Sequence, residues 1–202
     1  MKVVVIGASG TIGSAVADAL EDNGHEVVRA ARQSGDERVD IADLASIESF
    51  FGRVKEIDAV VTTAGDGKFG PLATLSQEDY ELGLRHKLMG QVNVLRAGMK
   101  HVAVGTSFTL TSGVLSREPM PGSSALAMAN GALEAFVKAA ALELREHKLR
   151  VNVVSPIWVK ETMLKLGMDP EGGMSAKDTA RAYLASVEGT DTGALLDVRD
   201  FA

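Results

Sequence analysis

Short, continuous apolar runs alternate along the chain with longer segments whose apolar residues recur every three or four positions. The run at 2–6 is typical of a strand buried on both faces of a sheet, and 11–23 has the spacing of a helix that ends at Asn23-Gly24. Further strands are predicted at 26–31, 58–61, 107–111, 149–154 and 194–198, and further helices at 43–54, at 124–147, at 176–187 and, as a pair, within 76–100. This alternation predicts an α/β fold, with a mostly parallel sheet of six to seven strands and helices on both faces.

One connection in this pattern is unusually short. Parallel neighbours need a connection of roughly a dozen residues or more, but 32–39 cannot hold a crossover helix. We therefore expect that this helix is deleted and that the third strand, at 38–40, is either very short or absent.

Three glycines, Gly7, Gly10 and Gly13, lie between the first strand and the first helix. Glycine lets the backbone turn sharply and approach a pyrophosphate, and the free N–H groups of the helix N-terminus favour negative charge. A turn that needs glycines only for packing is the alternative. The strand before the loop and the helix after it favour a doubly wound Rossmann domain, 1–202, that binds a dinucleotide. The other loop positions expected to contact it are Ser9, Thr11 and Ile12.

The end of the second strand indicates which dinucleotide is bound. A carboxylate there would bind the ribose 2′-hydroxyl of NAD, whereas arginine suits the 2′-phosphate of NADP. No carboxylate occurs between Val27 and Gly35, but Arg29, Arg32 and Ser34 do. We therefore expect NADP in preference to NAD, the alternative being that both arginines are simply solvated.

Composition narrows the class of partner. The net charge of −6 argues against nucleic acid, which requires a basic face. The absence of cysteine excludes thiolate chemistry, and the four histidines have no close ligand spacing, so we expect no metal site. No apolar run is expected to span a membrane, and the first strand leaves no room for a targeting segment. These features predict a cytoplasmic protein with a small-molecule substrate.

Several motifs together resemble the short-chain dehydrogenase/reductase family over nearly the whole chain. The segment Gly7–Gly13 is similar to its glycine motif, Asp40-Ile41 to the pair that contacts adenine, and 62–65 (Thr-Thr-Ala-Gly) to its Asn-Asn-Ala-Gly segment. The segment 150–159 resembles the stretch before the nicotinamide, with Ile157 where glycine is usual. The resemblance implies further cofactor contacts from Thr63, Ala64, Gly65, Pro156, Ile157, Val159 and Thr162, the last holding the carboxamide.

The catalytic positions depart from that family, which uses an Asn, a Ser and a Tyr-x-x-x-Lys pair. Ser112 matches the serine, but Leu126 stands at the tyrosine and Asn130 at the lysine. Lys87, in a segment resembling Val-Asn-Leu-x-Gly, stands at the asparagine, so lysine and asparagine have exchanged places. Asn130-Gly131 interrupts an alanine-rich helix at a cost of roughly 0.5–1 kcal/mol per residue, which a hydrogen bond from Asn130 into the site would offset.

The resemblance implies an NADP(H)-dependent oxidoreductase acting on a small, largely apolar carbonyl or alcohol through a non-standard proton donor. Ser112, Lys87 and Asn130 are the candidate catalytic residues. Two residues have a plain alternative: Ser112 caps a turn, or Lys87 is a solvated helix lysine. The alternative functions are a catalytically inactive NADP(H)-binding or redox-sensing module and, without specific support, an isomerase.

Two surface features complete the expectations. Residues 157–175 are interpreted as a short apolar lid, with Trp158, Met163, Leu164, Leu166, Met168 and Met174. A homodimer or homotetramer is expected through the helices near 84–100 and 124–147, because the family pairs these helices and the second is rich in alanine. Tight packing within one chain is the alternative reason for those small residues.

Overall fold

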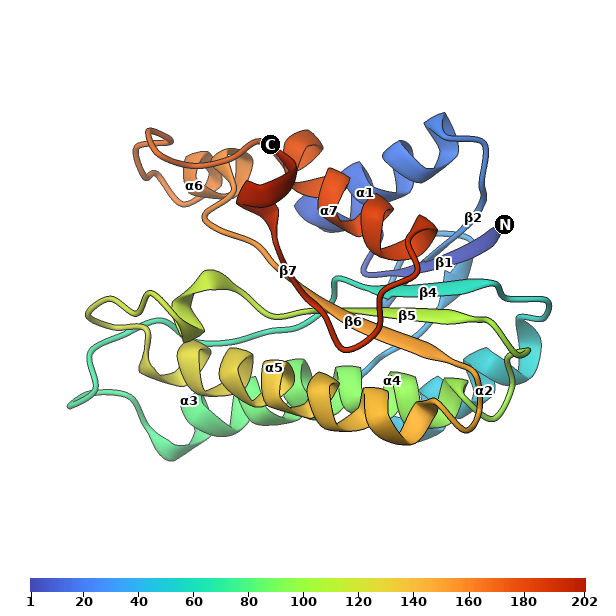
Figure 1. Cartoon of the computed structure of the whole chain (residues 1–202). Helices are drawn as coiled ribbons and strands as arrows, with labels where there is room; N and C mark the ends of the chain where they lie inside the picture. Colours follow the sequence, from blue (N-terminus) through green and yellow to red (C-terminus); the bar gives the residue numbers. More distant parts are fainter.

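Seven strands form one parallel sheet in the computed structural model, which describes residues 1–202 (Figure 1). Their order is β3-β2-β1-β4-β5-β6-β7. The strands are β1 (Lys2–Ile6), β2 (Glu26–Ala31), β3 (Glu37–Arg38), β4 (Ala59–Thr62), β5 (Ser107–Thr111), β6 (Arg150–Ser155) and β7 (Leu195–Asp197). The predicted α/β fold is therefore confirmed. From β1 the chain adds strands first on one side of the sheet (β2, β3) and then on the other (β4 to β7), so the switch point lies between β1 and β4. These two strands pair in parallel from Val3–Ala59 to Ile6–Thr62.

The third strand is very short, as one of the two expectations had it. Only Ala30 and Ala31 of β2 pair with it, opposite Glu37 and Arg38. The connection from β2 contains a turn at Gly35, whose φ of +88° is readily adopted only by glycine. No crossover helix lies between these strands, which leaves the carboxyl end of β2 open on one side.

Helices cover both faces of the sheet (Figure 1). One face carries α1 (Thr11–Asp22) and α7 (Ala176–Glu188), with α6 (Lys160–Lys165) at the edge near the carboxyl ends of the strands. The opposite face carries α2 (Leu44–Arg53), α3 (Gln77–Leu82), α4 (Gly90–Gly98) and α5 (Ser124–Leu144). Successive β1 residues alternate between the two cores, with Val3 and Val5 on the α1/α7 side and Val4 and Ile6 on the other. This double burial explains the continuous apolar runs.

The two helices predicted within 76–100 form one continuous helical run. A π-helical segment, Gly83–Met89, joins α3 to α4, and the junction residues Gly83 and Gly90 keep right-handed helical backbone angles. A π-helical insertion widens a helix locally and shifts the direction of its side chains, and such insertions occur frequently at functional sites. Lys87 lies inside this segment.

Helix α5 differs from the expectation that no segment could span a membrane. By length and composition it is long and apolar enough, with a mean hydropathy of 1.3 over 18 residues. In the fold, 44% of that window is buried, and Ala129, Leu133 and Val137 are fully covered where α5 packs against β6. Its apolar residues therefore form part of the hydrophobic core between α5 and the sheet.

Candidate active site

Two cavities lie side by side at the carboxyl ends of the strands. The first, the apolar cavity, has a volume of about 260 Å³, and the second, the polar cavity, about 290 Å³. Thr63, Ala64 and Gly65, directly after β4, line both of them. The two cavities therefore meet at the point where the strand order reverses, which is where open α/β sheets bind ligands.

The glycine loop forms one wall of this cleft. Gly7 has a φ of +94°, and a Cβ there would lie 2.7 Å from the backbone nitrogen of Ala64. A Cβ on Gly13 would lie 2.1 Å from the carbonyl oxygen of Gly7, so the loop and α1 can pack only without it. Gly10, the N-cap residue of α1, lines the polar cavity and receives no side-chain cap, which leaves the helix N–H groups available to an anion.

The sequence-predicted cofactor residues come together around the two cavities. The polar cavity is lined by Gly7, Ser9, Gly10, Arg32, Asp40 and Ile41 together with the shared 63–65 segment. The apolar cavity is lined by Ile12, Pro156, Ile157, Val159 and Thr162 together with the same segment. Thr11 and Gly13 belong to the first turn of α1 and line neither cavity. A glycine cradle, an uncapped helix N-terminus and a two-part cleft fit a dinucleotide.

The two arginines in and after β2, Arg29 and Arg32, have different surroundings. Arg32 is exposed and lines the polar cavity, as the NADP expectation requires. Arg29 instead turns toward α1, where its guanidinium donates to Asp18 at 2.6 Å and to Glu21 at 2.9 Å; these bonds raise its pKa. The expected role of Arg29 is therefore wrong, because two carboxylates already occupy its donors. Ser34 is exposed and lies outside both cavities.

Lys87 enters the apolar cavity from the π-helical segment. Its Nζ donates to the carbonyl oxygen of Ser112 at 2.9 Å, and burial lowers its pKa to about 8. Its side chain lies against Gly65, where a Cβ would be 2.8 Å from Lys87 Cγ. The glycine that ends the 62–65 segment thus provides the room for this lysine. Lys87 is the one charged residue that lines the apolar cavity.

Asn130 and Leu126 enter the same cavity from α5. The Nδ2 of Asn130 donates to the carbonyl oxygen of Gly113 at 3.3 Å. Its Oδ1 is buried and has no hydrogen-bond partner, so an unsatisfied acceptor lies beside the cavity. Lys87 and Asn130 therefore converge on neighbouring carbonyl groups, although they do not bond to each other. Leu126 lines the cavity where the family's tyrosine is expected.

Ser112 lines the apolar cavity, but its hydroxyl is engaged elsewhere. Its Oγ donates to Glu134 Oε1 at 3.1 Å, and Ser116 Oγ donates to the same oxygen at 2.6 Å. Arg117 lies 3.9 Å from that oxygen and bonds Asp197 at 2.9 Å. Arg199 also binds Asp197, and together the two arginines lower the pKa of that carboxyl. A hydroxyl has one proton, so this arrangement opposes the idea that Ser112 donates to a substrate.

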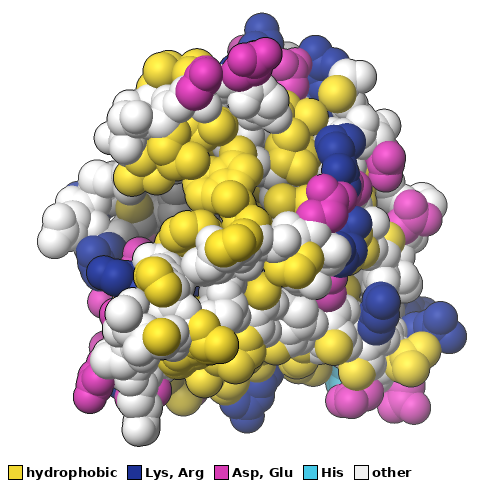
Figure 2. Space-filling model, turned by 90° about the vertical axis from the view of Figure 1, so that its left-hand side faces the viewer, with side chains coloured by type: hydrophobic (Ala, Val, Ile, Leu, Met, Phe, Trp, Pro, Cys, Tyr) yellow, Lys and Arg dark blue, Asp and Glu magenta, His cyan; other side chains and the backbone are white.

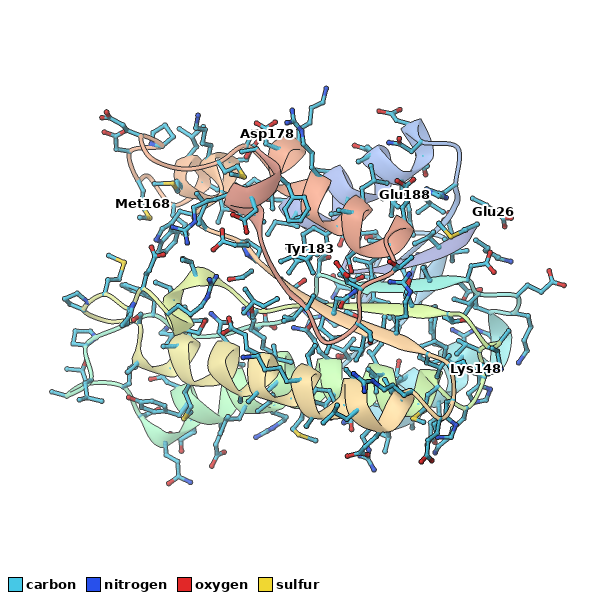
Figure 3. All side chains as sticks on the ribbon, viewed as in Figure 1. Glu26, Lys148, Met168, Asp178, Tyr183 and Glu188 are labelled. Carbon is cyan, nitrogen blue, oxygen red and sulfur yellow. The ribbon has the colours of Figure 1, made fainter.

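Neither tyrosine of the chain can act as a proton donor in the apolar cavity. Tyr183 points from α7 toward the sheet (Figure 3), is fully buried and bonds Thr111 Oγ1 at 2.9 Å; burial raises its pKa. The hydroxyl of Tyr80 bonds Ser124 Oγ at 2.8 Å. Neither lines the apolar cavity. Lys87 is therefore the remaining ionisable group that could exchange a proton with a ligand there.

The segment 157–175 contains α6 and folds back beside the cleft. Val159 bridges to Met174, and Met163 is buried, whereas Leu164 and Leu166 are exposed. Trp158 lines the apolar cavity and makes an edge-on contact with Phe69 of the facing loop, with ring centroids 6.2 Å apart. Figure 2 shows hydrophobic side chains gathered over this face of the molecule.

Sequence reasoning missed several residues around the cleft. Gln91 is fully buried and pairs with both backbone groups of Thr111, which fixes the end of β5. Glu134, which binds Ser112 and Ser116, lies in the alanine-rich helix α5, where no motif marks it. His86 lines the polar cavity with Asp66, 3.4 Å away. The helical spacing predicts that His86 and Lys87 point in different directions, and the two residues do line different cavities. The spacing could not show that a second cavity lies on the side of His86.

Comparisons with known proteins agree with this geometry. A family model described as enoyl-(acyl carrier protein) reductase matches residues 7–194. The trihydroxynaphthalene reductase of Colletotrichum orbiculare is 26% identical over 71% of this chain, which spans only 54% of that relative's length. The crystal structure of the protein lin1944 from Listeria innocua has a TM-score of 0.92 and 40% identity, covering 98% of this chain and 99% of that one.

A further solved structure carries a cofactor. A small-chain dehydrogenase in complex with NADPH has a TM-score of 0.84 and 29% identity, covering 98% of this chain and 95% of that one. The family match covers most of the sequence, residues 7–194. The chain therefore belongs to the short-chain dehydrogenase/reductase family.

Proposed function

We propose that this protein is an NADP(H)-dependent oxidoreductase that interconverts a small, largely apolar carbonyl compound and its alcohol, with Lys87 as the proton donor. The observation that carries the proposal is the position of Lys87. It is the one charged group lining the apolar cavity, its Nζ is held 2.9 Å from the Ser112 carbonyl, and its pKa is about 8. A group with a pKa near the working pH is suited to general acid catalysis.

The choice of cofactor rests on the polar cavity. Arg32 lines this cavity. No carboxylate stands at the end of β2 to accept a hydrogen bond from a ribose hydroxyl. Arginine can bind a 2′-phosphate through two parallel hydrogen bonds. The 29% identical dehydrogenase that was solved with NADPH supports the same choice. Asp40 and Ile41 would then contact the adenine, and Thr162 the carboxamide.

In this account, each residue of the apolar cavity has one role. NADPH, when bound, supplies the hydride that reduces the carbonyl carbon. The ammonium of Lys87 donates a proton to the substrate oxygen, becomes a neutral amine and recovers a proton from water. The Ser112 carbonyl orients the lysine, and Asn130 lines the cavity and holds the neighbouring Gly113 carbonyl. Ser112 acts through its backbone carbonyl, because its hydroxyl is bonded to Glu134.

The walls of the cavity favour an apolar substrate of modest size. Val114, Leu115, Leu126, Ile157 and Trp158 line the cavity, whose volume is about 260 Å³ before any cofactor occupies part of it. The apolar lid, 157–175, would exclude water from the reacting groups when it covers them.

Turnover distinguishes this proposal from the NADP(H)-binding, redox-sensing alternative, which is favoured by Leu126 at the tyrosine position. Small carbonyl and enone compounds are screened for loss of NADPH absorbance with the wild-type protein and the Lys87→Met variant. Turnover that Lys87→Met lowers supports the enzyme. NADPH binding without any turnover across the screen would favour the binding module instead.

A self-association surface is also proposed, on the helices near 84–100 and 124–147. Met89, Met128 and Leu142 expose 41%, 42% and 61% of their surface, and apolar side chains on a helical face favour association. Light scattering at micromolar concentration should give the mass of a dimer or tetramer. A monomeric mass would contradict this.

A further inference from the structure

A lysine at the end of α6 reaches across the cleft to the glycine loop. The Nζ of Lys165 lies 2.8 Å from the hydroxyl oxygen of Thr11, the first residue of α1. The two residues are 154 positions apart in the sequence. This hydrogen bond therefore links the lid segment to the wall that faces it.

Lys165 contacts α1 at a residue that stands between the linings of the two cavities. Thr11 stands between Gly10, which lines the polar cavity, and Ile12, which lines the apolar one. Thr162, one helical turn before Lys165, lines the apolar cavity from the other side. A ligand that fills both cavities would run along the loop from Gly10 to Ile12 and so pass close to Thr11. In NADP(H), the group that joins the two halves is the pyrophosphate.

The charges around Lys165 and the N-terminus of α1 favour the binding of an anion. Lys165 is exposed, contacts a neutral hydroxyl and takes part in none of the ion pairs of the structure. The first turn of α1 contains no acidic residue, and its N-terminus adds partial positive charge. Placing an ammonium beside the positive end of a helix is unfavourable unless a negative group lies between them. A phosphate would satisfy both.

We propose that Lys165 is a cofactor-binding residue that contacts the pyrophosphate of NADP(H) and thereby holds α6 over the cleft. This role rests on the proposed function and adds to it a specific residue outside the glycine loop. A charge-assisted hydrogen bond to phosphate is strong and depends on salt. The lid segment would therefore be held more firmly when the cofactor is present than when it is absent.

Calorimetric titration with NADPH tests this in wild type, Lys165→Met, Lys165→Arg and Lys160→Met. Lys160→Met is the matched control, because it removes the same charge from the other end of α6, and Lys160 does not share the bond of Lys165 to Thr11. We expect Kd to rise about tenfold in Lys165→Met, less than about threefold in Lys165→Arg, and less than about twofold in Lys160→Met. The affinity of Lys165→Met should also depend less steeply on salt than that of wild type.

Hydrogen exchange of residues 160–168 provides a second readout. NADPH should slow exchange there in wild type and Lys160→Met, and distinctly less in Lys165→Met. Equal Kd values and equal protection in the two methionine variants would overturn the role of Lys165 while leaving the proposed function intact. A wild-type protein that binds no NADPH would instead overturn the proposed function, and this inference with it.

Discussion

The two halves of the cleft differ in how closely they follow the family pattern. Around the polar cavity the glycine loop, Arg32 and the Asp40-Ile41 pair stand where a dinucleotide would need them. Around the apolar cavity the fold is equally intact, but Leu126, Asn130 and Lys87 stand where the resemblance leads one to expect tyrosine, lysine and asparagine. The binding half depends on backbone geometry, and the reacting half depends on the identity of a few side chains.

This difference indicates that cofactor binding and the reaction depend on separate parts of the cleft. The backbone of the glycine loop is fixed by contacts such as Gly13 against Gly7, so it tolerates little change. In the proposed function, the proton donor needs only to be a titratable group at the right place, and the π-helical segment brings Lys87 into the apolar cavity from a different helix. Substitutions in the binding half should therefore change affinity, and substitutions in the reacting half should change turnover.

Gly13→Ala should have the largest effect. The new Cβ would lie 2.1 Å from the carbonyl oxygen of Gly7, so the loop or α1 must shift. We expect the Kd for NADPH to rise by about a hundredfold or more, together with a loss of thermal stability, as overpacking predicts. Gly52→Ala in α2 is the control, since a Cβ there meets nothing within 4 Å. Unchanged NADPH affinity in Gly13→Ala would break the account of the loop.

Lys87→Met should lower kcat by about a hundredfold with any substrate found in the screen, which is typical of removing a general acid. The Kd for NADPH should change by less than about threefold, because the cofactor contacts lie mainly elsewhere. Lys138→Met, on the exposed side of α5, is the matched control. A large loss of affinity with unchanged kcat would reverse the assignment of the two halves.

Arg32→Ala should raise the Kd for NADPH by about tenfold and leave that for NADH nearly unchanged, because only NADPH has a 2′-phosphate. Arg29→Ala is the sharper comparison. Arg29 is bonded to Asp18 and Glu21, so we expect its loss to affect stability slightly and cofactor preference not at all. Equal effects of Arg32→Ala on both cofactors would contradict the assignment.

The dependence of stability on pH provides a further test of Lys87. The folded-state pKa of Lys87 is lowered to about 8 from 10.5, so between these values the unfolded chain holds a proton that the folded chain has released. Stability from this group therefore increases as pH rises from about 8 to 10.5. Urea titrations should show wild type gaining stability relative to Lys87→Met over that range. A constant difference would indicate that Lys87 is solvated.

The sequence predicted the parts of the molecule that depend on local pattern. Burial on both faces gives continuous apolar strands, so the fold followed from the sequence. The 32–39 segment is too short for a crossover helix, so β3 was expected to be either very short or absent. The roles of Arg29 and Ser112 could not be predicted, because Asp18, Glu21 and Glu134 reach them only through tertiary packing. The π-helical segment also left no clear signal, since Gly83 and Gly90 fit an ordinary helix.

Calorimetric titration of the wild-type protein with NADPH and with NADH is the most direct test of the central claim, that this cleft is an NADP(H) site. The glycine loop and Arg32 predict that both bind in the same place and that NADPH binds at least about tenfold more tightly. Failure of both to bind, or NADH binding as tightly as NADPH, would contradict the account.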